Sequence, residues 1–158
     1  MKSKTLLGLV WSVINTHTQG NDHSPSLSLC MPLITGILQP AARPGETLAF
    51  NREERLSLVK ATRHIVLCVV NEKTGKDMGS VDSLWVDLHG HLRVLATLDE
   101  GQEHVIASMK SGTIYRFALV TACTRTASGD TYNKRIDCIQ LTTGPVNDGD
   151  LTRAWPLA

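Results

Sequence analysis

The chain has 158 residues, of which 42% are hydrophobic and only 4% aromatic, and its 16 basic and 15 acidic residues give a net charge of +1. This length fits one domain with its own core, and the hydrophobic content excludes a disordered chain. Because near-neutral charge provides no basic field for nucleic acid, we expect no nucleic-acid partner.

The N-terminal segment is apolar and then polar. Lys2 and Lys4 precede an apolar run at 6–14, a pattern that imitates a signal peptide. No small-x-small cleavage site follows, and the run is far shorter than the ~20 residues that span a bilayer. We therefore predict that residues 1–28 form an arm and a polar linker, without a membrane partner. Three side chains of the arm are candidate partner contacts: Leu9, Trp11 and Ile14.

Residues 29–158 are predicted to form a single β-barrel-like domain. The segment 31–40 is typical of a strand, which ends at its proline. A helix is expected over 51–63, because Asn51 is a good N-cap and acidic residues occupy the first turn. The almost continuous apolar, β-branched run at 64–71 indicates a buried strand.

The following elements alternate short apolar runs with turn residues. Strands at 80–88 and 89–98 are joined by the His89-Gly90 turn, and a short helix at 101–112 stops at a glycine. The rest of the chain is predicted as a strand at 113–125, a hairpin loop at 126–134, a strand at 135–143 and a turn-rich exit at 144–150. This series predicts a mainly β fold, a closed or partly open β-barrel or sandwich with one or two short helices.

The cysteine and histidine spacings give little sign of a metal. Four cysteines lie far apart without a CxxC pair, and three of them fall in apolar runs: Cys68, Cys123 and Cys138. We expect buried free thiols in a reducing compartment. His89 and His91 form an H-x-H pair without an adjacent third ligand, and no phosphate-binding glycine motif is present. No metal or other cofactor is expected.

Four segments follow one another in an order that matches a known family. They are ITGILQP with GETLAF at 34–50, the strand–loop–hairpin series at 66–98, MKSGTIYRFALVTA at 109–122 and IDCIQLTTGPVN at 136–147. In the last segment Asp137 takes the acidic position, and Pro145 and Asn147 match the closing pattern directly. Together, over roughly residues 30–150, they resemble the fold shared by tailed-phage prohead proteases and herpesvirus assemblins, which are capsid maturation proteases.

The resemblance implies that the catalytic residues have been replaced. Where the family has a histidine after asparagine, this chain has Glu72 after Asn71. The serine position falls on Ala118, or on Val120 in a register two residues on, and neither side chain can attack a carbonyl. Only Asp137 keeps an acid. The three positions Glu72, Ala118 and Asp137 are therefore expected to converge without forming a catalytic site.

A protease-like fold without its nucleophile implies a binding role. The resemblance implies a non-catalytic virion or capsid-associated protein of a bacteriophage or related virus, with a decoration, cement or scaffold role. Its partners would be capsid or other virion proteins, with a homo-oligomer on the particle, located in the virion and assembled in the host cytoplasm. Trp155, near the end of the chain, is a further candidate partner contact because aromatic anchors often bury at interfaces.

Two other classes of function remain open. The chain could be an active serine-type maturation protease whose site lies in another register. The nucleophile would then be Ser108, Ser111 or Thr121, and the base His64 or His104. It could also be a β-rich protein-binding module without a viral connection.

Overall fold

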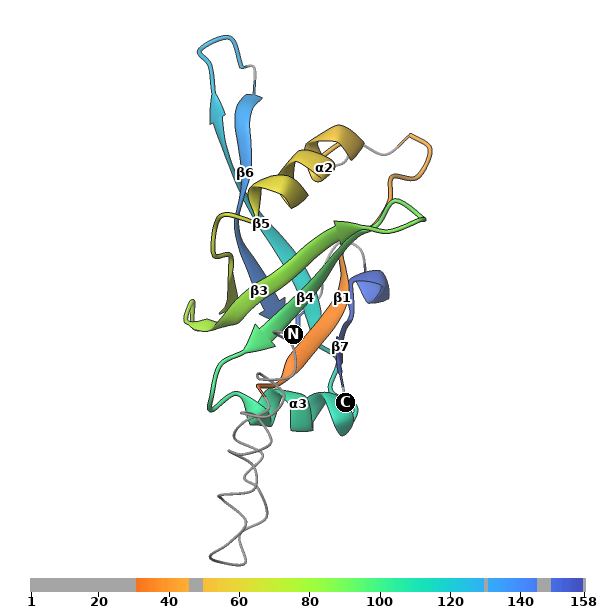
Figure 1. Ribbon diagram of the computed structural model, residues 1–158, viewed down its shortest axis with the longest axis vertical. Coiled ribbons are helices and arrows are strands. Elements are labelled where there is room, and N and C mark those ends of the chain that lie inside the picture. Colours follow the sequence, from red (N-terminus) through yellow and green to blue (C-terminus); the bar gives the residue numbers. More distant parts are fainter. Residues whose placement is uncertain (1–30, 46–49, 130, 145–148, 158) are drawn as a thin grey trace, which may run out of the picture. The chain divides into compact units, whose positions relative to one another are not determined.

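The computed structural model describes residues 31–45, 50–129, 131–144 and 149–157 (Figure 1). The chain divides into two units, Met1–Cys30 and Met31–Ala158, and all of the described residues belong to the second unit. The arm and linker predicted at 1–28, with Leu9, Trp11 and Ile14, lie outside the described residues.

The described part contains strands, two α-helices and a short 3-10 helix. In chain order they are β1 (Leu33–Gln39), α2 (Arg52–Ala61), β2 (Cys68–Asn71), β3 (Asp77–Val86), β4 (Leu92–Leu98), α3 (Glu103–Lys110), β5 (Arg116–Arg125), β6 (Thr131–Thr142), η2 (Gly149–Thr152) and β7 (Ala154–Pro156).

The strands form one seven-stranded sheet in the order β5-β6-β2-β3-β4-β1-β7. Neighbours are antiparallel, except that β2 and β6 run parallel. The sheet curls, so that Arg116 at the start of β5 forms a bridge with Arg153, just before β7. An ion pair of 2.6 Å from Arg116 to Asp150 and a hydrogen bond from the Ala154 N–H to the Tyr115 carbonyl support the same closure. The prediction of a mainly β, partly open barrel with two short helices is confirmed.

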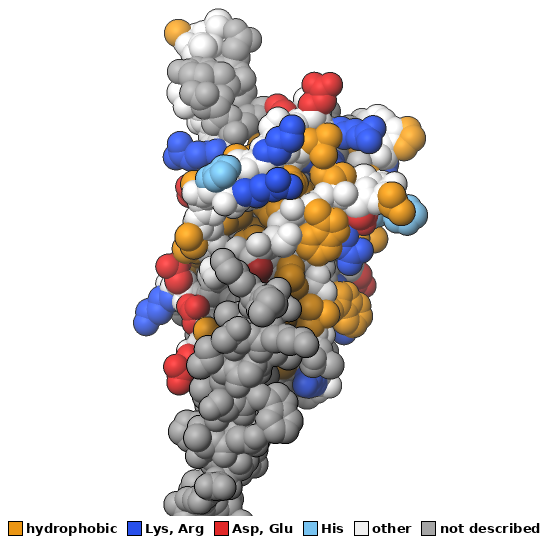
Figure 2. Space-filling view, in the orientation of Figure 1, with side chains coloured by type: hydrophobic (Ala, Val, Ile, Leu, Met, Phe, Trp, Pro, Cys, Tyr) orange, Lys and Arg blue, Asp and Glu red, His pale blue; other side chains and the backbone are white. Residues whose placement is uncertain are grey.

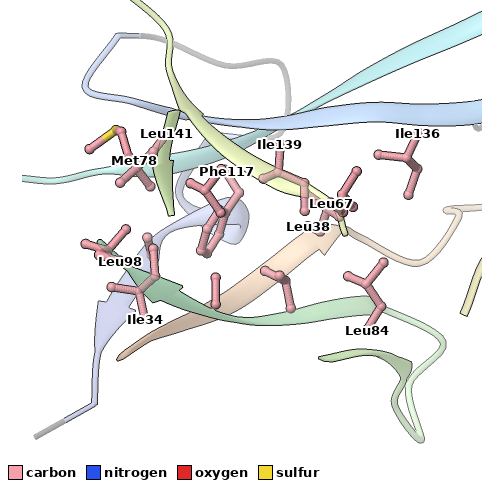
Figure 3. Close-up of a cluster of buried hydrophobic side chains, with 14 of the residues drawn as sticks. Ile34, Leu38, Leu67, Met78, Leu84, Leu98, Phe117, Ile136, Ile139 and Leu141 are labelled. Carbon is pink, nitrogen blue, oxygen red and sulfur yellow. The ribbon is translucent and has the colours of Figure 1, made fainter. Parts of the chain in front are cut away.

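The core lies on the concave side of the curled sheet (Figure 3). In β1 and β4, alternate residues are buried, which is the pattern of strands with one face toward a core. Phe117 from β5 is 1% exposed and fills the space beside Gly36 on β1. A Cβ at Gly36 would lie 2.9 Å from the Phe117 ring, so the closure of the sheet requires glycine there.

The helix boundaries follow the local signals. The Asn51 side chain accepts from the Glu54 N–H at 2.9 Å, and the Glu54 carboxylate accepts from the Asn51 N–H at 2.7 Å, which completes a capping box. After α3, Gly112 has φ of +106°, a conformation that favours glycine. Both helices therefore begin and end within a few residues of their predicted ranges.

One buried cation joins α2 to the rest of the domain. The Arg55 side chain is buried, and its guanidinium donates to three main-chain carbonyls, those of Phe50, Pro40 and Gly90. These carbonyls belong to the segment before α2, the end of β1 and the β3–β4 turn. Burial lowers the pKa of Arg55, although a guanidinium remains charged at any ordinary pH.

Several local predictions are wrong in extent. The strand predicted at 64–71 is reduced to β2, and Ile65 and Val66 are 58% and 82% exposed. The chain leaves α2 through a turn before it reaches the sheet, so the β propensity of this run is overridden by its position. Strand β7 was not predicted, because it is three residues long and contains a proline. The predicted burial is also wrong for Cys123, which is exposed, while Cys68 and Cys138 are partly buried.

Candidate functional site

The three family positions lie on or beside three neighbouring strands. Glu72 follows the end of β2, and its carboxylate accepts a hydrogen bond of 2.9 Å from the Thr142 hydroxyl. Ala118 is partly buried on β5, opposite Gln140 of β6. Asp137 is exposed on β6, at a point where the register with β5 shifts.

The strand register separates these positions. Along β6, Asp137 is three residues from Gln140 and five from Thr142, by subtraction of their numbers. At a rise of about 3.3 Å per residue, these steps are about 10 Å and 16 Å. Catalytic partners need hydrogen-bond contact, at about 2.6–3.2 Å. The register therefore does not group Glu72, Ala118 and Asp137 into one centre.

The alternative nucleophiles and bases have other contacts. The Ser111 hydroxyl donates to the Ser108 carbonyl at 2.9 Å, and the His104 ring contacts a carbonyl of its own turn at 3.2 Å. His64 is exposed after α2, and Thr121 is exposed on β5. Within the described residues, no hydrogen bond joins any of these hydroxyls to a histidine. None of them is arranged as an activated nucleophile.

The two histidines of the β3–β4 turn belong to the turn itself. The His91 ring nitrogen Nδ1 accepts from the Ala41 N–H at 2.8 Å, and the Asp87 carboxylate accepts from the N–H groups of His89 and His91. Burial alone would raise the pKa of Asp87, but these two donors and the nearby Arg93 lower it overall. In the described ranges, no group of three or more His, Cys, Asp or Glu residues could hold a metal ion.

The convex side of the sheet carries a second set of side chains, which the strand register aligns in rows. In one row Leu95 of β4 pairs with Thr35 of β1, and Thr35 pairs with Trp155 of β7. In the next row Trp85 of β3 pairs with Arg93 of β4, and Arg93 with Ile37 of β1. We call the surface made by these residues the outer face: Thr35, Ile37, Trp85, Arg93, Leu95 and Trp155.

The outer face is partly exposed to solvent. Trp155 is 50% exposed and Trp85 is 36% exposed, while the intervening side chains of β1 and β4 are partly buried by their neighbours. Figure 2 shows hydrophobic side chains gathered over the region where Figure 1 places β3, β4, β1 and β7. Exposed apolar side chains that gather on one face often mark interaction sites.

Cations accompany the aromatic rings of this surface. The Arg153 guanidinium lies 4.0 Å from the centroid of the Trp155 ring, a cation–π contact that holds the indole against its strand. Arg93 forms an ion pair of 3.6 Å with Asp87, and its Nε is buried with no hydrogen-bond partner among the described residues. The Thr35 hydroxyl is satisfied by the Val94 carbonyl at 2.9 Å. The outer face thus combines tryptophan and arginine, the residues enriched at the centres of protein interfaces.

Sequence reasoning found one half of this surface. Trp155 was predicted as a partner contact, and the structure places it at the sheet edge beside β1. Trp85 was not singled out, although its neighbour Leu84 is buried and the alternation along β3 could have indicated that Trp85 points outward. What brings the two tryptophans onto one face is the pairing of β3, β4, β1 and β7.

No protein-family model and no curated protein sequence matches the chain. Among the helices described, none is long and apolar enough to cross a membrane.

Proposed function

We propose that the chain is a non-catalytic protein-binding subunit and that its outer face binds a partner protein. The observation that carries this proposal is the pair of exposed tryptophans, Trp85 and Trp155, on one face of the sheet together with Arg93 and Arg153. Few residues supply most of the energy of an interface, and tryptophan and arginine are foremost among them.

The exposed area of one ring gives the scale of the effect. An aromatic side chain buries about 150–250 Å² when fully covered, and covering apolar area contributes about 25 cal/mol per Å². Trp155 is 50% exposed, so covering the remaining half contributes about 2–3 kcal/mol. Trp85, at 36% exposure, adds a smaller amount.

The resemblance proposes the class of partner. A relative of prohead proteases that has Glu72 and Ala118 at the base and nucleophile positions would act as a structural part of the virion. Its partner would be a capsid or other virion protein of a bacteriophage or related virus, and its role that of a decoration, cement or scaffold protein. The order of four sequence segments along the chain, at 34–50, 66–98, 109–122 and 136–147, supports this assignment.

The experiment compares the full chain with a double variant, Trp85→Ser with Trp155→Ser. Each tagged protein is produced in the cells or virus-infected culture from which the sequence derives, and proteins bound to it are cross-linked, recovered and quantified by mass spectrometry. Leu88→Ser is the matched control, because Leu88 is 103% exposed on the β3–β4 turn and is not one of the residues that form the outer face.

We expect recovery of one stoichiometric partner to fall at least tenfold with the double variant, equivalent to about 1.4 kcal/mol, and to stay unchanged with Leu88→Ser. Equal recovery with all three proteins would contradict a role for the outer face. A partner that is not a particle component would contradict only the virion assignment. Labelling of a single serine by a fluorophosphonate probe would overturn the non-catalytic assignment.

A further inference from the structure

One long edge of strand β5 has no partner among the strands that the structure describes. It is the first strand in the sheet order, so β6 is its single strand neighbour along most of its length. On the edge of β5 opposite β6, only the first residue, Arg116, is paired among the described residues, through its bridge with Arg153. From 117 to 125, no other described strand pairs with that edge. Such an edge presents a row of N–H and C=O groups to which another strand can bind.

The free edge of β5 is also regular. Between Val120 and Thr121, the paired residues on β6 step from Cys138 to Ile136, so the extra residue belongs to β6. The second irregularity, between residues 122 and 124 of β5, again adds its residue to β6. Because both bulges lie on the inner strand, the outer edge of β5 continues without interruption.

The composition of β5 does not protect this edge. Native proteins block free edges with proline, lysine or short strands. The segment 117–125 reads FALVTACTR, and Arg125 at its far end is its one charged residue. At the opposite edge of the sheet, β7 has three residues and ends in Pro156. The described sheet therefore has one blunted edge and one open edge.

We propose that β5 pairs antiparallel with β5 of a second copy of this chain around a two-fold axis. A strand that pairs with the open edge must itself have an open edge, and the longest one in the described part of this chain is β5. Hydrogen-bonded and non-hydrogen-bonded pairs alternate in an antiparallel ladder, so two-fold symmetry requires one residue to face its own copy. Thr121 is that residue, because it is the midpoint of 117–125.

This register gives compatible cross-strand neighbours. Val120 faces Ala122, Leu119 faces Cys123, and Ala118 faces Thr124 in the other copy. Arg125 faces the position of Phe117, so no like charges are opposed. The two curled sheets then form one continuous sheet. The proposal uses a different surface from the outer face, so either proposal stands if the other fails.

The experiment places charges on Thr121, which is exposed and therefore tolerates substitution in the monomer. The full chain, Thr121→Lys, Thr121→Glu and a mixture of the two variants are compared by sedimentation equilibrium from nanomolar to near-millimolar concentration. Thr124→Lys is the control, because it is also an exposed threonine of β5 and faces Ala118 rather than its own copy. Thermal melts establish that each variant is folded.

We expect the native chain to dimerise weakly and reversibly, because a single pair of strands forms a small interface. Either Thr121 variant alone should raise the dissociation constant about fivefold, equivalent to ~1 kcal/mol, because like charges face each other. The mixture should restore or exceed the native affinity, and Thr124→Lys should change it little. A native chain that stays monomeric throughout, or a dimer that both Thr121 variants leave unchanged, would overturn the proposal.

Discussion

Replacing Arg55 by methionine tests the interpretation of α2 as a helix held by one buried cation. Methionine retains much of the aliphatic length of arginine but cannot donate. The substitution therefore removes the hydrogen bonds to Phe50, Pro40 and Gly90 and leaves their carbonyls without this donor.

The structure sets the expected loss of stability. The bonds to the Phe50 and Pro40 carbonyls are buried and the bond to the Gly90 carbonyl is partly buried. Leaving a buried acceptor unsatisfied costs about 1–3 kcal/mol, so two such carbonyls give a loss of about 2–6 kcal/mol in the free energy of unfolding. Arg55→Lys should lose about half of this, because one ammonium cannot span three separated carbonyls.

Urea unfolding followed by far-ultraviolet circular dichroism measures these differences in the free energy of unfolding, provided that the m-value is the same for all variants. Arg52→Met is the matched control, because Arg52 is an exposed arginine in the first turn of the same helix. It should change the stability by no more than about 0.5 kcal/mol. If Arg55→Met cost no more than Arg52→Met, the three carbonyl contacts would not stabilise the domain and the reasoning would be refuted.

Two further predictions concern single groups. Exposed Cys123 should react with a thiol reagent at pH 8 much faster than Cys68 and Cys138. Burial, and after it neighbouring acidic groups, raise the pKa of the Cys68 and Cys138 thiols. Equal reaction rates in single-cysteine variants would contradict this prediction. Asp87→Asn should lower the free energy of unfolding near neutral pH by about 1 kcal/mol, and the melting temperature with it, because a neutral amide oxygen is a weaker acceptor than the carboxylate for the two main-chain N–H groups and cannot form the ion pair with Arg93. Since the pKa of Asp87 is lowered on folding, its contribution is complete above the unfolded pKa and is lost as pH falls through the folded value. The deficit should therefore shrink in acid, whereas Glu100→Gln, on an exposed turn, should show no deficit at either pH.

The β5 edge and the outer face lead to different kinds of assembly. A dimer through β5 extends the sheet by main-chain hydrogen bonds, whereas the outer face offers side chains that a partner can cover. A subunit with both surfaces could join its own copies and a second protein at once. That combination would suit a role on a particle, where multivalent contacts multiply the strength of weak ones.

The features that depend on neighbouring residues could be predicted from the sequence. Asn51 and Glu54 cap α2 through groups three residues apart, Gly112 stops α3 by its backbone conformation, and His89-Gly90 lies in the β3–β4 turn. Each of these depends on local hydrogen bonds or on φ, so a short window of sequence contains the whole cause. The alternating apolar residues likewise predicted a mainly β fold.

Tertiary structure alone decided which distant residues lie together. The pairing of strands placed Trp85 and Trp155 on one face, and the register along β6 set Glu72 and Asp137 far apart. Within the apolar run at 64–71, only the four residues of β2 pair in the sheet, and three residues near the end of the chain pair with β1 as β7. Strand register arises from the packing of the whole sheet against its core, and no local pattern contains that information.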